Sequence, residues 1–72
     1  MKAGDLVSLR MHYPASVFTH KKGLEQIIIS KGTTGLVISY EVRGPVPGVN
    51  VLFSTEDNVR WCPVEVLKAV NS

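Results

Sequence analysis

The 72-residue sequence lacks the covalent and metal supports on which many small domains depend. Cys62 is its single cysteine, so no disulfide can form within the chain, as expected of a protein from a reducing compartment. The two histidines, His12 and His20, have no cysteine pair at zinc-finger spacing. We therefore expect no metal site and no cofactor, and a marginal stability that depends on packing or on self-association.

Long hydrophobic runs are also missing, because no stretch approaches the ~18 apolar residues that a membrane span requires. Residues 1–5 carry a charge but are not followed by the apolar segment of a signal peptide. We therefore expect a soluble cytoplasmic protein with no membrane partner. Nothing in the pattern indicates a small-molecule substrate.

Charge is sparse and unevenly placed. Residues 1–35 contain five Lys or Arg against two acids, and residues 36–72 contain three against four. The acids fall at expected turns or exposed faces, so we expect no converging pair for acid–base catalysis and no enzyme. Cys62 lies between Trp61 and Pro63, where a packed apolar role is favoured over a nucleophilic one, and Trp61 is favoured as a core residue.

Alternating apolar and polar residues predict strands over most of the chain. We expect them at 5–11, 27–29, 35–42, 49–54, 59–62 and 67–70, with a 3₁₀ turn at 63–66. In the segment 35–42, one face carries Leu36, Ile38, Tyr40 and Val42. Residues 12–26 lose the alternation and are expected to form a long loop. The sequence predicts one all-β domain over residues 1–72, a meander of about five strands.

Short segments spread along the chain carry a resemblance to a known fold. Gly4-Asp5-Leu6-Val7, Gly35-Leu36-Val37 and Trp61-Cys62-Pro63, with the long first loop and the late 3₁₀ turn, resemble an SH3-like small barrel of five strands. The same segments resemble short uncharacterised barrels encoded by bacteriophages, which implies a viral or accessory protein of the host cytoplasm or the virion. The turn at 31–37 is similar to the glycine-centred turn of KOW-type barrels, which contact RNA in ribosomal and transcription proteins.

The first functional hypothesis is a non-catalytic protein-interaction module, such as a phage structural or accessory protein, that docks on a larger assembly or on itself. Its expected contact residues are Tyr13 and Phe18 of the first loop and the β-branched edge Ile27, Ile28 and Ile29. Tyr13 and Phe18 are equally compatible with folding back as a cap on the barrel. For the isoleucines, the alternative is one face in the core.

The rival hypothesis is a KOW-like RNA- or DNA-binding barrel. It would use Lys21, Lys22, Lys31 and Arg43 for phosphate contacts, and Tyr13 or Phe18 for stacking on bases. We rank it second because few basic residues could converge, and because proline and glycine separate them along the chain.

Overall fold

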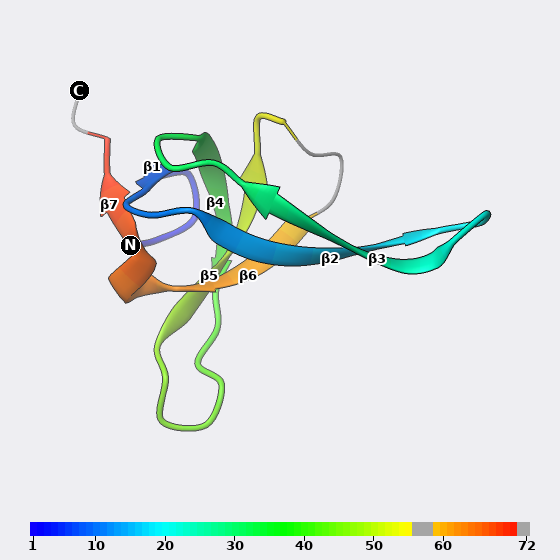
Figure 1. Cartoon of the computed structure of the whole chain (residues 1–72). Helices are drawn as coiled ribbons and strands as arrows, with labels where there is room; N and C mark the ends of the chain where they lie inside the picture. Colours follow the sequence, from blue (N-terminus) through cyan, green and yellow to red (C-terminus); the bar gives the residue numbers. More distant parts are fainter. Residues whose placement is uncertain (56–58, 71–72) are drawn as a thin grey trace.

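The computed structural model describes residues 1–55 and 59–70, leaving aside the side chains of residues 17–19. The elements are β1 (Leu6–Leu9), β2 (Tyr13–Thr19), β3 (Gly23–Ile29), β4 (Thr34–Tyr40), β5 (Gly48–Phe53), β6 (Val59–Pro63), the 3₁₀ turn η1 (Val64–Val66) and β7 (Leu67–Ala69). The all-β prediction and the 3₁₀ turn before the last strand are confirmed (Figure 1). The expected turn at 55–58 lies mostly outside the described residues.

Five strands form one antiparallel sheet in the order β6-β5-β4-β1-β7. The first and last strands of the chain therefore lie side by side, while β4, β5 and β6 follow one another as a meander. Over the described residues the sheet is open, with β6 and β7 as its two edges. A register shift between Val37 and Ser39 on β4 marks a β-bulge, which increases the local twist.

The prediction of a long first loop is wrong. Residues 13–29 form the β2–β3 hairpin, which is paired from Tyr13 opposite Ile29 to Thr19 opposite Gly23. Gly23 has a φ of 72°, which glycine adopts without steric cost and which lets the chain reverse at the tip. The hairpin projects from the body as an arm, and the molecule measures 39 × 27 × 19 Å (Figure 1). The sequence pattern failed because both faces of this hairpin carry apolar residues, so no clean alternation marks it.

The core lies between the inner face of the five-stranded sheet and the base of the hairpin. It consists of Val7, Leu9, Ile29, Val37, Val49, Val51, Phe53, Cys62, Val66 and Leu67, with Tyr13, Ala15, Ile27 and Val64 packed against it. Cys62 is fully buried, as predicted. Trp61 is only half-buried and lies outside this cluster, so the prediction that it is a core residue is wrong.

The predicted apolar face of residues 35–42 is divided between the two sides of the sheet by the bulge between Val37 and Ser39. Leu36 pairs with Leu52 on the outer side and is 40% exposed, whereas Tyr40 pairs with the buried Val49 on the inner side. Val37, which the alternation places on the opposite face from Leu36, is 1% exposed and belongs to the core. Alternation located the strand, but it could not show the bulge or which apolar face the hairpin would cover.

Candidate protein-interaction surfaces

An uninterrupted row of apolar side chains crosses the outer face of the five-stranded sheet. Leu6 pairs with Leu36, Leu36 with Leu52, and Leu52 with Val59, so these four residues share one face of β1, β4, β5 and β6. The Val70 N–H donates to the Leu6 carbonyl oxygen at 2.9 Å, which places Val70 beside Leu6 just after β7. Directly paired residues have Cβ atoms ~4.5–5.5 Å apart, so the side chains touch. We call these five residues the outer apolar row.

The exposure of this row is high for a small protein. Its members are 37–53% exposed, and Ile38, next to it on β4, is 43% exposed. Contiguous apolar patches beyond roughly a few hundred Å² are uncommon on soluble monomers and mark contact sites. The row therefore forms a contiguous exposed apolar surface that a partner could cover.

Sequence reasoning missed this row, although the sequence contains a signal for it. At Leu6-Val7, Leu36-Val37 and Val51-Leu52-Phe53, neighbouring residues are both apolar and must point to opposite faces of a strand. Three strands with the same feature imply a sheet that is apolar on both faces. The register then brings the outward members into line.

The structure divides the predicted contact residues of the hairpin into two groups. Tyr13, Ile27 and Ile29 face the core, where Ile29 is 3% exposed and Tyr13 and Ile27 are partly buried. The Tyr13 hydroxyl donates to the Trp61 carbonyl oxygen at 3.4 Å, and burial raises the pKa of this phenol. Ile28 points the other way and is 64% exposed. Phe18 pairs with Leu24 through the backbone, and its side chain lies outside the described part.

The outer edge of β3 presents unpaired main-chain groups. The Arg60 Nη1 donates to the Ser16 carbonyl oxygen at 2.7 Å, so Ser16 points its backbone away from β3. Because Ser16 pairs with Gln26, alternate residues of β3, which are Leu24, Gln26 and Ile28, direct their N–H and C=O groups away from β2. Outside the hairpin, no main-chain bond joins these three to another described residue. The predicted open edge is therefore present, but its apolar side chains are Leu24 and Ile28.

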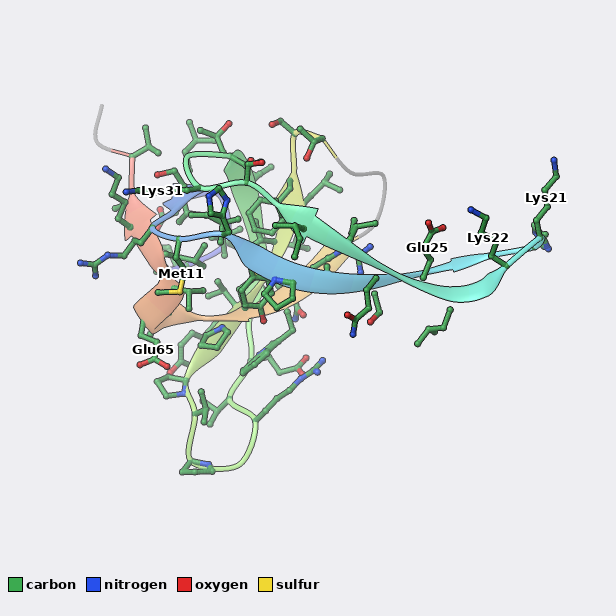
Figure 2. All side chains as sticks on the ribbon, viewed as in Figure 1. Met11, Lys21, Lys22, Glu25, Lys31 and Glu65 are labelled. Carbon is green, nitrogen blue, oxygen red and sulfur yellow. The ribbon has the colours of Figure 1, made fainter. Side chains whose placement is uncertain are left out.

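The four basic residues of the rival hypothesis do not converge. Figure 2 shows Lys21 and Lys22 at the tip of the arm and Lys31 on the far side of the body. Arg43 is engaged elsewhere: it forms an ion pair with Glu41 at 2.6 Å, and its guanidinium lies 5.0 Å from the centroid of the Trp61 ring. Its hydrogen bond, together with one from the Asn50 side chain, lowers the pKa of the Glu41 carboxyl.

The described residues contain no group of three or more His, Cys, Asp or Glu side chains arranged to hold a metal ion. Burial raises the pKa of the Cys62 thiol to about 11, so the thiolate needed for nucleophilic chemistry is scarce near neutral pH. Among the described segments, none is a helix with the length and hydrophobicity needed to traverse a lipid bilayer. In comparisons with known proteins, no family model, curated protein or solved structure matches this chain.

Proposed function

We propose that this chain is a non-catalytic protein-interaction module that docks on a larger assembly through the outer apolar row. The observation that carries the proposal is the in-register exposure of apolar side chains on all five paired segments, from Val70 through Leu36 to Val59. Stable protein interfaces bury ~800 Å² on each partner, usually with an apolar centre and a polar rim. The row supplies such a centre, since Asn50 flanks it on one side and Ser8 and Thr34 on the other.

The open edge of β3 is a second contact in this proposal. An extended segment of a partner, or a second copy of the chain, would add a strand to the hairpin through the main-chain groups of Leu24, Gln26 and Ile28. Exposed edges with apolar side chains favour such pairing, and Leu24 is 75% exposed. This contact retains the predicted role of Ile28.

An SH3-like small barrel is the architecture that we propose for the domain. The strand order supports it, because β1 lies between β4 and β7, the meander β4-β5-β6 follows, and η1 precedes the last strand. The β2–β3 hairpin takes the place of the long first loop of that fold. The resemblance to short bacteriophage-encoded barrels suggests a virion or an accessory phage complex as the larger assembly.

The test substitutes the centre of the row without changing charge or strand propensity. If the partner is another protein, Leu36→Thr and Leu52→Thr should each abolish its recovery by cross-linking. If the partner is a second copy of the chain, each variant should abolish the increase of the sedimentation coefficient with concentration. In both cases the melting temperature should stay near that of the wild type. Val42→Thr is the matched control, because Val42 is 51% exposed but lies beyond the row. Ile28→Lys tests the β3 edge separately by the same measurements. The proposal fails if the wild type sediments as a monomer and every protein that cross-links to it also cross-links to the Leu36→Thr variant.

A further inference from the structure

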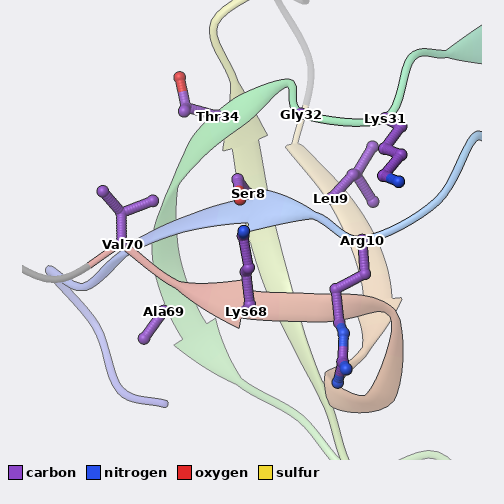
Figure 3. Close-up of a pocket in the computed structure, with 9 residues that line it drawn as sticks. All are labelled: Ser8, Leu9, Arg10, Lys31, Gly32, Thr34, Lys68, Ala69 and Val70. Carbon is purple, nitrogen blue, oxygen red and sulfur yellow. The ribbon is translucent and has the colours of Figure 1, made fainter.

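A groove on the outer face of the sheet gathers three cationic side chains that sequence reasoning did not group. It lies along β1 and β7 and beneath the turn between β3 and β4 (Figure 3). It is open to solvent and has a volume of about 650 Å³. Arg10 and Lys31 stand at one end of the groove, and Lys68 lies along β7 toward Ser8 (Figure 3). Lys31 belonged to the rival set of predicted phosphate ligands, but Arg10 and Lys68 did not.

Main-chain contacts fix the Cα positions of these three basic residues. The Arg10 N–H donates to the Val66 carbonyl oxygen at 2.9 Å, and the Lys31 N–H donates to His12 Nδ1 at 3.1 Å. Gly32, with a φ of 89°, turns the chain so that its N–H reaches the Leu9 carbonyl oxygen at 2.9 Å. Lys68 is held by its pairing opposite Ser8 in the sheet. The groove is therefore formed by the fold and does not depend on the placement of a free loop.

The groove carries an uncompensated positive charge. No Asp or Glu lines it, and among the described residues none of its three cations is in an ion pair. Three positive charges stand here in a chain whose net charge is +2, so they form a local concentration of its basic character. Like charges held together in this way favour an anionic ligand, which would relieve their mutual repulsion.

Two hydroxyl groups also line the groove. Ser8 is 5% exposed and lines the groove, yet its hydroxyl forms no hydrogen bond with another described residue. The Ser8 Oγ is not one of the buried side-chain atoms without a partner, so it is accessible from the groove and can donate to an anion beside Lys68. Thr34, paired with Ser8 and exposed, provides a second hydroxyl.

We infer that this groove binds the phosphodiester backbone of a single-stranded nucleic acid. Arg, Lys and hydroxyl donors are the groups that contact phosphate oxygens. The volume equals that of ~20 water molecules at ~30 Å³ each, which is more than one phosphate group fills. No aromatic or amide side chain lines the groove, so bases are not read, and the contact is independent of sequence. The inference does not rest on the proposed protein docking, whose central residues Leu36 and Leu52 do not line the groove.

The test is binding of a fluorescently labelled twelve-residue oligothymidylate, followed by anisotropy between 50 and 200 mM salt. Each phosphate contact to a single strand contributes ~0.7 to the slope of log affinity against log salt, so three contacts predict a ~20-fold loss over this range. Lys68→Gln should reduce that loss to ~7-fold, by removing one contact. Lys21→Gln, the same change at the tip of the arm, should leave the ~20-fold loss intact. Ser8→Ala should weaken binding at every salt concentration without altering the slope.

Competition identifies the ligand class. Inorganic tripolyphosphate should displace the oligonucleotide more effectively than polyglutamate of equal total charge, because its charges and acceptor oxygens are more densely spaced. The inference is overturned if binding is absent at 50 mM salt, if Lys21→Gln changes the slope as much as Lys68→Gln, or if polyglutamate competes equally well. Leu36→Thr should leave oligonucleotide binding unchanged, so failure of the docking proposal and failure of this one are distinguishable.

Discussion

Replacing Gly48 by alanine should displace the Trp61 ring from its position against β5. Gly48 lies on β5, beside β6, and a Cβ atom added there would meet Cε2 and Cζ2 of that ring and come within 2.6 Å of Nε1. The ring cannot retreat without loss, because Nε1 donates to the Glu41 carbonyl oxygen at 2.8 Å and the Arg43 guanidinium lies over its face. A methyl group and an indole therefore compete for the same space.

The expected cost follows from three contributions. Overpacking a well-filled site costs ~1–3 kcal/mol, the lost hydrogen bond ~0.5–1.5 kcal/mol, and the lost cation–π contact ~0.5–1 kcal/mol at an exposed site. Gly48 has no positive φ, so alanine adds no backbone strain and recovers ~0.4–1 kcal/mol through a less flexible unfolded chain. The net loss is ~1–5 kcal/mol, and each kcal/mol lowers the melting temperature of a domain this small by ~4–8 °C.

The assay is a double-mutant cycle followed by circular dichroism in urea. Trp61→Val keeps a β-branched residue on the strand but removes the ring, so Gly48→Ala in that background should no longer destabilise and should raise the free energy of unfolding by ~0.4–1 kcal/mol. The difference between the two backgrounds measures the clash. The reasoning is refuted if Gly48→Ala costs less than ~0.5 kcal/mol in the wild type, or costs the same in both backgrounds.

Two further predictions concern the core and the hairpin. The pKa of the Cys62 thiol is raised from 9.0 to about 11 by burial. The neutral thiol therefore contributes fully to the free energy of unfolding below pH 9. That contribution is lost as the pH rises toward 11, because the thiol of the unfolded chain ionises first. Urea titrations should show stability falling by up to ~2–3 kcal/mol over this interval in the wild type and by less in Cys62→Ala, and equal slopes would contradict the assignment. Arg60→Met, which removes the hydrogen bond to the Ser16 carbonyl oxygen but keeps the aliphatic stem, should speed amide hydrogen exchange in residues 13–29 and leave β4 and β5 unchanged. A uniform change across all strands would show that Arg60 does not act through the hairpin.

Much of the fold could be predicted from the sequence, because alternation and turn residues are local signals. The strand at 49–54 and the turn before β4 lie where the pattern places them, and proline at position 63 leads into the expected 3₁₀ turn. The hairpin could not be predicted in the same way. Pro14 and the polar tip suggest a loop, while the pairing of β2 with β3 is secured by Ile29 in the core and by Arg60 from a distant strand. Such tertiary contacts override local propensity.

The candidate sites show the same division between local and non-local information. Ile28 was predicted to be a contact residue from its own segment, and the hairpin leaves it exposed. Ile27 and Ile29 carry the same local signal but pack on the core, because the pleat turns odd-numbered residues of β3 inward. The cationic groove combines residues from β1, β7 and the turn at Lys31, which no spacing rule connects. Only the register of the sheet brings them together.

The apolar row and the cationic groove adjoin on one face, and their proximity has an energetic consequence. Ser8 follows Leu6 by two residues on β1, and Thr34 precedes Leu36 by two on β4, so the polar pair lines up directly beside the apolar one. Val70 belongs to both surfaces. A protein that covers the row must therefore reach the edge of the groove. Acidic residues at the margin of that protein would compete with phosphate for the cations, and basic residues there would strengthen phosphate binding. Measuring oligonucleotide affinity with and without the docked partner gives the sign of this coupling, and linkage requires the partner's affinity to change by the same factor.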